Sequence, residues 1–390
     1  MHWIIDGSPL GSGRGGDETY ATSILSGLSQ TALSTTQENV TVVRRRTTRK
    51  SDIGATYPTT LRDVGACVRT SARSGAGFYG LAFPLAVRQL AGDAVLSFTH
   101  APASIGRART GMVLAVLDLS FEHLPAAYPR ATRARLRSII RHQVDVADRI
   151  ATISEWSKQD MIDTYSIDPD RVHVIPGSVS LPVAIPLERE VALRAWKRSV
   201  GISDRYVLYL GNLHPRKNVA TAIRAFARGP RRSGYQMVLA GARWWGEDET
   251  RAIESLGLSP SEIVLTGQVT DEQREVLLRG AACMIYPSIF EGFGLPPLEA
   301  MARGIPVVAS RSTAIPEVLG DAALLVDALD DQSMADAMVR AADCAETRQS
   351  LIAAGRHRAA HWSIARTGHA ARAALVVAAA QRTGAAPWVG

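Results

Sequence analysis

The sequence predicts an α/β protein of two domains, each built on a parallel sheet with helices on both faces. Its 390 residues are enough for two domains of ordinary size. Strand-like apolar runs alternate with helical patterns from one end of the chain to the other, which is typical of parallel sheets. Residues 176–186 contain Pro182 and Pro186 and little helical pattern, so we expect them to link two such series.

The first series begins with an apolar strand, residues 3–6, which leads into the glycine-rich segment 7–16. Asp17 is placed to cap a helix that runs to about Leu28. Residues 48–77 are weakly patterned, and we expect them to form a mobile loop. Further strands and helices are expected at residues 40–43, 80–91, 94–98, 112–117, 130–146, 149–153 and 172–175.

The second series has the same alternation and ends in Ala-rich helices, from Gln332 to about Arg382. Its expected strands are residues 207–210, 236–240, 263–265, 282–286, 307–309 and 323–326. The two series predict an N-terminal domain over residues 1–180 and a C-terminal domain over residues 186–362. The final segment, residues 363–390, is expected to be a helix that crosses back to the first domain.

The composition predicts a soluble, cytoplasmic protein with an uneven charge. No apolar stretch approaches the roughly 20 residues that span a bilayer, and the first residues lack the basic segment of a signal peptide. Cys67, Cys283 and Cys344 are far apart and have no metal-ligand spacing, as in a reducing compartment. Residues 44–141 hold 16 Lys and Arg against 5 Asp and Glu, a net charge of +11, so the rest sums to −4. This half either faces an anionic partner or has a solvated basic surface.

The segment from Glu291 to Glu299 joins an apolar strand to a helix that is predicted to open at Pro296. Gly292 and Gly294 leave backbone N–H groups at the helix N-terminus approachable by an anion. Proline is tolerated in the first turn, because its missing N–H would have no helical partner there. Glu299 lies about one turn inside the helix, so the two carboxylates bracket a niche of phosphate size. The segment therefore predicts an anion site beside acceptors for hydroxyl groups; an acid-capped helix is the alternative.

A cationic segment follows the first strand of the second series. Residues 211–218 read Gly-Asn-Leu-His-Pro-Arg-Lys-Asn. They place Arg216 and Lys217 at the carboxyl end of a parallel strand, where ligands bind in such sheets. Arg can hold a phosphate with two hydrogen bonds and Lys acts as a point charge. The segment predicts a phosphate site, and the alternative is a capping turn with two exposed cations.

Gly11-Ser12-Gly13-Arg14-Gly15-Gly16 satisfies the pattern G-x-G-x-x-G between a strand and a helix. This pattern is typical of dinucleotide binding, with Gly15 and Gly16 suited to close backbone approach. An NAD site would also need an acidic residue near the end of the second strand, and the chain has Arg44-Arg45-Arg46 there. NAD is therefore excluded, and an NADP-dependent oxidoreductase stays open as an alternative.

Together these segments resemble those of retaining glycosyltransferases of family 4 (glycosyl transferases group 1), the mannosyltransferase-like members in particular. Glu291 to Glu299 is similar to the E-x7-E motif of that family. Residues 211–218 resemble its G-x4-R-K motif, with Asn212 where many relatives have Arg. Residues 266–271 and 310–323 are also similar to family segments. The resemblance implies the GT-B fold, in which two Rossmann-like domains have parallel sheets that face a central cleft.

The resemblance also implies an activity. A hexosyl unit, best matched by mannose, would pass with retention from a nucleoside-diphosphate sugar, GDP- or UDP-linked, to an acceptor hydroxyl. The acceptor would be a glycan, glycolipid or small molecule, and no metal or other cofactor is expected. By resemblance, Glu291 contacts the donor sugar, Glu299 the ribose, and Arg216 with Lys217 the diphosphate. The other expected donor-binding residues are Gly15, Gly16, Asn212, Gly267, Val269, Ser288, Phe293, Gly294 and Leu295.

The first domain departs from the family pattern near the expected sugar site. Relatives commonly have His-Asp-Leu-Ser after the strand at 112–117, whereas this chain has Leu117 before Asp118. His100 ends the preceding strand, and it either compensates for the lost histidine or is an ordinary strand-end residue. Asp118 either positions the acceptor or caps a helix. The departure leaves open a third class, a non-catalytic protein that binds sugar nucleotides.

Two charged features remain. Asp168-Pro169-Asp170 lies in a polar turn, so we interpret it as a turn and not as a metal site. The basic stretch 130–149 either contacts anionic lipid at the inner face of a membrane or is a solvated helix. The arginines that it places beside apolar positions are Arg130, Arg133, Arg135, Arg137 and Arg141. Nucleic acid is not an expected partner, because no aromatic residues interleave with these arginines.

Overall fold

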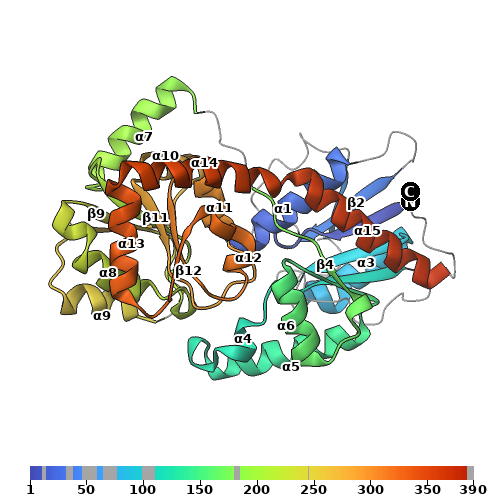
Figure 1. The fold of residues 1–390 in the computed structure, drawn as a ribbon. Helices are drawn as coiled ribbons and strands as arrows, with labels where there is room; N and C mark the ends of the chain where they lie inside the picture. The colour runs from blue at the N-terminus through green and yellow to red at the C-terminus, as the bar shows by residue number, and fades with distance from the viewer. Residues whose placement is uncertain are drawn as a thin grey trace. The chain divides into compact units, whose positions relative to one another are not determined.

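The computed structural model describes residues 1–10, 15–31, 38–45, 59–64, 77–98, 110–179, 185–244 and 246–383. The chain divides into two compact units (Figure 1). Unit 1 comprises residues 1–178 and 363–390, and unit 2 comprises residues 179–362. Each unit holds one parallel sheet covered by helices, which confirms the predicted fold class.

Unit 1 contains a seven-stranded sheet in the order β3-β2-β1-β4-β5-β6-β7. Its strands are β1 (His2–Asp6), β2 (Asn39–Arg45), β3 (Thr59–Val64), β4 (Ala94–Phe98), β5 (Gly111–Ala115), β6 (Arg149–Thr152) and β7 (Val172–Val174). Its helices are α1 (Gly15–Gln30), η1 (Phe78–Ala82), α3 (Phe83–Leu90), α4 (Ser120–His123), η2 (Pro125–Ala127), α5 (Arg130–Val146), α6 (Glu155–Tyr165), η3 (Pro169–Arg171) and α15 (Ile364–Thr383). The apolar runs predicted as strands in this half all lie in this sheet.

Two expectations for unit 1 were wrong in detail. The stretch 48–77 was expected to be a loop, but its residues 59–64 form β3, which pairs in parallel with β2. This strand reads Thr-Thr-Leu-Arg-Asp-Val, and it lies at the edge of the sheet, where polar residues are tolerated and the apolar signal is weak. Helix α1 begins at Gly15, so Asp17 lies inside its first turn and not at its cap. A carboxylate in that turn still favours the helix through its dipole.

Helix α15 packs along α1 within unit 1 (Figure 1). The two helices cross at Gly27 and Gly368, where a Cβ built on Gly368 would lie 2.1 Å from the Gly27 carbonyl oxygen. Arg372 of α15 is buried and pairs with Glu38 at 2.8 Å. The helix is therefore held to this unit by close backbone contact and by a buried ion pair.

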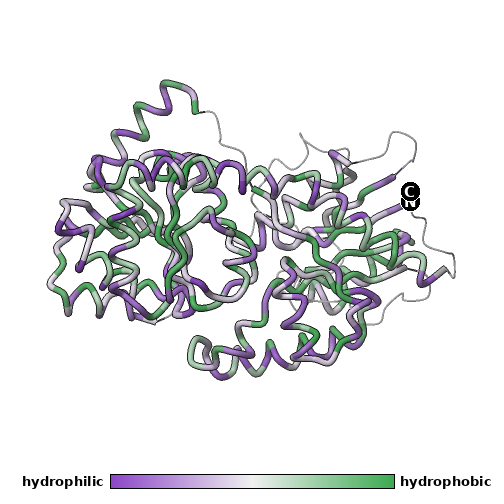
Figure 2. Tube along the Cα trace, in the orientation of Figure 1, coloured by the Kyte–Doolittle hydropathy of each residue, from purple (hydrophilic) through white to green (hydrophobic). Residues whose placement is uncertain are grey.

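Unit 2 contains a six-stranded parallel sheet in the order β10-β9-β8-β11-β12-β13. Its strands are β8 (Tyr206–Leu210), β9 (Gln236–Ala240), β10 (Ile263–Gly267), β11 (Cys283–Tyr286), β12 (Val307–Ser310) and β13 (Leu324–Val326). Its helices are α7 (Leu187–Ser199), η4 (Pro215–Lys217), α8 (Val219–Arg228), η5 (Pro230–Ser233), α9 (Asp248–Ser255), α10 (Asp271–Gly280), α11 (Leu295–Ala302), α12 (Ile315–Leu319), η6 (Gly320–Ala322), α13 (Asp331–Asp343) and α14 (Ala345–His361). Figure 2 shows apolar residues concentrated along the central strands, because both faces of a parallel sheet are buried.

Each sheet reverses its strand order at one point. In unit 1 the neighbours there are β1 and β4, and in unit 2 they are β8 and β11. Open α/β sheets bind ligands beyond the carboxyl ends of the strands at such a switch point. Among the described residues, no helix is both long enough and apolar enough to cross a bilayer.

Candidate functional site

The loop after β8 brings two cations to the switch point of unit 2. Proline at the start of η4 and the His214 side chain, whose Nδ1 accepts from the Arg216 N–H at 3.1 Å, fix the turn. Asn218 ends it with a φ of +54°, a conformation that asparagine tolerates better than most residues. Its amide donates to the Ala328 carbonyl at 2.6 Å. The cationic segment is thus a locally braced turn that presents Arg216 and Lys217 to the loop after β11.

The loop after β11 leads into α11 through Gly294, which has a φ of +109°. This backbone conformation favours glycine, and a Cβ at this position would also displace Cδ1 of Ile315, which lies 2.8 Å away. Helix α11 begins at Leu295, one residue before the predicted start, and Pro296 lies in its first turn. Pro296 and Pro297 have no N–H, so the donors at this end are the N–H groups of Gly294 and Leu295, which have no helical carbonyl to bond and suit an anion.

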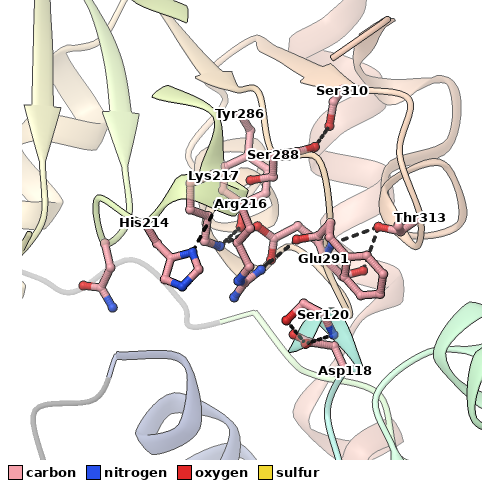
Figure 3. A network of polar contacts seen from close by, with 12 residues as sticks. Asp118, Ser120, His214, Arg216, Lys217, Tyr286, Ser288, Glu291, Ser310 and Thr313 are labelled. Carbon is pink, nitrogen blue, oxygen red and sulfur yellow. Dashed lines mark hydrogen bonds and ion pairs between the residues drawn. The ribbon is translucent and has the colours of Figure 1, made fainter. Parts of the chain in front are cut away.

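Glu291 holds both cations (Figure 3). Its Oε1 pairs with Lys217 Nζ, and its Oε2 lies 3.1 Å from Arg216 Nη1. The lysine also donates to the Tyr286 hydroxyl at 3.0 Å. Burial by itself raises the pKa of Glu291, but Lys217 and Arg216 outweigh it and lower the pKa to about 2. The carboxylate is therefore ionised at any ordinary pH, and the three predicted residues form one buried charged cluster.

Glu299 has a partner that the sequence did not reveal. Arg274, from the first turns of α10, donates through Nη1 to both carboxylate oxygens at 3.0 and 3.1 Å. Burial nevertheless raises the pKa of Glu299, although Arg274 and Arg303 oppose the shift. One sequence signal could have located Arg274. Thr270 and Gln273 form a capping box that marks the start of α10, so Arg274 lies in the first turn of the helix that follows the carboxyl end of β10.

The remaining predicted residues of unit 2 differ in what they present. Gly267 is exposed with a φ of +67°, and Val269 is half-buried beside it at the end of β10. The Tyr209 hydroxyl donates to the backbone carbonyl of Asn212 at 2.9 Å. Phe293 is buried and packs edge-on against Trp362, with ring centroids 4.9 Å apart. Its side chain is therefore a core group, while Leu295, at the start of α11, is half-buried.

Ser288 is fully buried, and its carbonyl accepts from the Ser310 hydroxyl. Its backbone lies on the path that leads to Glu291. The site in unit 2 therefore combines the Arg216–Lys217–Glu291 cluster, the glycine-led start of α11 and the Arg274–Glu299 pair.

Comparison with known families identifies the chain. The family model described as Glycosyltransferase Family 4 matches residues 15–181, and the model described as Glycosyl transferases group 1 matches residues 194–358. The chain belongs to the group 1 glycosyltransferases. This membership favours the glycosyltransferase interpretation of the glycine-rich segment over the NADP interpretation; residues 11–14 lie outside the described part of the chain.

Several relatives carry mannosyltransferase names. O-antigen chain mannosyltransferase B of Escherichia coli is 30% identical over 248 residues, which cover 63% of this chain and 65% of the relative. A serotype-specific mannosyltransferase, WbdA of Escherichia coli, is 33% identical over 58% of this chain and 28% of its own length. The MMP alpha-(1->4)-mannosyltransferase of Mycolicibacterium hassiacum is 31% identical over 54% of this chain and 49% of the relative. The matched stretches thus span less than two thirds of each of these relatives.

Solved structures share the whole fold. WaaG, a glycosyltransferase of lipopolysaccharide biosynthesis, superposes with a TM-score of 0.67 over 98% of this chain and 100% of that chain, at 17% identity. Anabaena HepE, solved with UDP and glucose, gives 0.68 over 95% and 97% of the two chains, also at 17% identity. The fold is therefore GT-B, with one Rossmann-like sheet in each unit.

The structure describes only some of the site residues that were expected in unit 1. Asp118 Oδ1 accepts from the Ser120 N–H at 3.0 Å and from its hydroxyl at 2.6 Å, at the start of α4. Asp118 lies one residue before the N-cap of α4, which is Leu119, so these bonds hold the segment that leads into the helix. Gly15 opens α1, and a Cβ on Gly16 would meet no atom within 4 Å among the described residues, so packing does not demand glycine there. His100 lies outside the described residues.

The Asp168-Pro169-Asp170 sequence forms a turn. Asp168 accepts from the Asp170 N–H at 2.9 Å and caps η3. Across the described residues, no group of three or more His, Cys, Asp and Glu side chains is arranged to hold a metal ion.

Proposed function

We propose that this chain transfers a hexosyl unit, mannose first among the candidates, from a nucleoside-diphosphate sugar to an acceptor hydroxyl, with retention and without a metal. One observation carries the proposal. Two cations, a carboxylate and an open helix start converge at the sheet's switch point in a chain of the group 1 family. The relatives named as mannosyltransferases support the choice of sugar.

The leaving diphosphate is the group that most needs stabilisation. It gains negative charge as the sugar bond breaks, and preorganised cations and N–H donors lower that barrier. Lys217 and Arg216 are 12% and 19% exposed, so their charges act with little screening by water. Together with the N–H groups at Gly294 and Leu295 they would neutralise the diphosphate without Mg²⁺.

Glu291 and the diphosphate would share the same cations. Both carboxylate oxygens are now paired with them, and a bound donor adds phosphate oxygens to that set. A carboxylate can accept about four hydrogen bonds, so Glu291 keeps capacity for sugar hydroxyls while it stays paired. The same reasoning assigns the ribose to Glu299, which Arg274 orients.

We propose that the sugar bond breaks first and that the acceptor oxygen attacks from the face that the diphosphate leaves. The new bond forms between the anomeric carbon and the acceptor oxygen, and the electron pair of the broken bond goes to the phosphate oxygen. The acceptor proton passes to that phosphate oxygen. This route needs no carboxylate nucleophile in unit 1, where Asp118, in the segment after β5, already accepts from the Ser120 N–H and hydroxyl.

The acceptor would be a glycan or glycolipid, since relatives are named for O-antigen chains, or a small molecule. Helix α5 supports a contact with anionic lipid, because Arg130, Arg135 and Arg141 are exposed on it. Its apolar positions Ile140 and Val144 are buried in the core of unit 1, so such contact would be electrostatic and not insertion. We therefore propose the cytoplasmic face of a membrane as the place of action.

A second candidate is a non-catalytic protein that binds sugar nucleotides, favoured by Leu117 in place of the family histidine. One screen separates the two. Thermal shifts with GDP, UDP, dTDP and ADP sugars would find the donor, because a selective ligand stabilises the native state by mass action. Release of free nucleotide from that donor supports transfer. Binding without release, with or without acceptor, supports the second candidate, and the absence of any shift contradicts both.

A further inference from the structure

The loop that carries Glu291 is bonded from outside at each residue from Pro287 to Glu291. Asn218 and Arg216, from the cationic segment, contribute on one side. The Asn218 amide donates to Pro287 O at 3.2 Å, the Ile289 N–H donates to Arg216 O at 2.9 Å, and Arg216 Nη1 donates to Phe290 O at 2.7 Å. These contacts come from the segment that is itself proposed to bind the diphosphate.

The segment after β12 supplies the other side of this bonding. The Ser310 hydroxyl donates to the carbonyl of Ser288. Thr313 bonds the backbone of Glu291 in both directions: its hydroxyl donates to Glu291 O at 2.9 Å and accepts from the Glu291 N–H at 2.9 Å. One side chain therefore satisfies both backbone groups of the residue that holds the two cations, as Figure 3 shows.

Thr313 makes these bonds from a strained backbone. Its φ is +49°, in the left-handed region. A β-branched residue at positive φ is an outlier, because its branched Cβ crowds the backbone there. Such strain persists only where surrounding interactions compensate, and it gathers at functional sites. Glycine would adopt this backbone without strain, so the chain keeps a hydroxyl at an energetic cost.

We propose that Thr313 is a positioning residue that holds Glu291 in the geometry needed to contact the donor sugar. The inference rests on the proposed function, because it assigns the sugar contact to Glu291. Across the described residues, the Thr313 hydroxyl bonds the backbone of Glu291, so it acts through that carboxylate and not on the donor. Fixing the N–H and C=O of one residue fixes the direction of its Cα–Cβ bond, and hence where the carboxylate meets Lys217.

The test uses three variants of the full chain. Thr313→Val keeps the shape and removes the hydroxyl, Thr313→Gly removes both the hydroxyl and the strain, and Thr313→Ser keeps the hydroxyl. Calorimetric titration with GDP and GDP-mannose, and with UDP and UDP-glucose, gives the gain in affinity that the sugar provides. We expect this gain to fall about tenfold in the valine and glycine variants, as for loss of a hydrogen bond to a charged group. GDP or UDP alone should bind no more weakly than to wild type, because a displaced carboxylate competes less for Lys217, and serine should restore the gain.

A double substitution separates positioning from a general structural role. In the Glu291→Gln background, Thr313→Val should change the sugar gain by less than twofold, because the group it positions is already altered. An equal loss in both backgrounds would overturn the proposal, as would an unchanged gain in both Thr313→Val and Thr313→Gly.

A ligand-free measurement keeps the inference testable by itself. Crystal structures of Thr313→Val and Thr313→Gly should show the Glu291 carboxylate displaced from Lys217. If it stays in place in both, Thr313 does not position it, whatever the chain binds. If GDP, GDP-mannose, UDP and UDP-glucose all fail to bind wild type, the proposed function with these donors fails. The crystal structures alone then decide the positioning role.

Discussion

The two switch points have the same strand connections, but the pKa of the buried carboxyl group at each one shifts in the opposite direction. At β8 and β11, Glu291 is buried between two cations that lower its pKa to about 2. At β1 and β4, Asp6 is equally buried, but burial dominates and raises its pKa to about 6. Hydrogen bonds from the Ser8 N–H, the Tyr79 hydroxyl and the Phe98 N–H, at 2.9, 3.1 and 3.2 Å, only partly offset that rise. Neutral donors partly compensate a buried charge, whereas paired cations reverse the shift.

The comparison indicates a division of labour between the units. A site with concentrated positive charge suits the anionic half of a sugar nucleotide, and a site with neutral hydroxyl and amide groups does not. We therefore expect substitutions at the first switch point to act on stability and those at the second to act on donor chemistry.

The largest effect is expected at the cations. Lys217→Ala and Glu291→Ala should each lower turnover by at least about a hundredfold, the cost of removing one electrostatic group from a preorganised site. The rate of nucleotide release from the donor chosen by thermal shift measures this. Arg189→Ala is the matched control, since Arg189 is 64% exposed in an ion pair with Glu272. Its turnover should stay within about twofold of wild type. Turnover of both site variants near that of the control would remove the mechanism.

Much of this fold was predictable because buried parallel strands are apolar throughout. The strands of both sheets except β3 were predicted from such runs, and α5 has the predicted bounds. Strand β3 was not predicted, because its sequence has no apolar pattern. It is a strand because its backbone pairs with β2, and this pairing exists only in the folded sheet. Local pattern therefore predicts the elements that bury apolar surface and misses the one defined by pairing.

The site was predictable to the level of motifs and not of contacts. Arg216, Lys217 and Glu291 were named from their segments, and the structure brings them together. Arg274 was missed because its pairing with Glu299 depends on how α10 packs beside α11. Thr313 was missed because a left-handed threonine has no local sequence signal. Both are set by tertiary packing.

The second prediction concerns pH and the sign of the comparison. Asp6 has a raised pKa in the folded state, so it contributes most to the free energy of unfolding at pH values below its ordinary pKa of 3.8. This contribution is lost as the pH rises through about 6. Between pH 4 and 6 the loss should be about 2 kcal/mol. Asp6→Asn should remove that loss, and urea unfolding at pH 4, 5 and 6 measures it.

Glu291 should behave in the opposite sense. Its folded pKa is lowered, so its contribution is present above 4.5 and is lost as pH falls through about 2. As the pH rises from 4 to 6, Glu291 should add about 1 kcal/mol to the free energy of unfolding. Glu291→Gln and Asp6→Asn should therefore change the pH dependence of the free energy of unfolding in opposite directions. Slopes that change in the same direction would break the electrostatic contrast between the two switch points.

The third prediction separates competition from preorganisation at the cations. Because Glu291 occupies both Lys217 and Arg216, a free nucleoside diphosphate must compete with it for them. Glu291→Gln should therefore bind GDP or UDP about tenfold more tightly while its turnover falls, since one neighbouring charge is worth about that much in a screened site. Calorimetric titration gives the affinity. Weaker binding would instead mean that Glu291 acts mainly to hold the cations in place for the diphosphate.

The smallest effect is expected at the surface of unit 1. If α5 meets anionic lipid, Arg135→Ala should lower binding to vesicles that contain phosphatidylserine by about fivefold, as for one charge near the membrane. Arg194→Ala on α7 is the matched control, because Arg194 is 69% exposed and lies in unit 2. Co-sedimentation at two salt concentrations measures both variants, and screening by salt should reduce the difference between them. Equal binding of the two variants at low salt would mean that the arginine-rich face of α5 is only solvated, and the contrast between the units would then rest on their switch points alone.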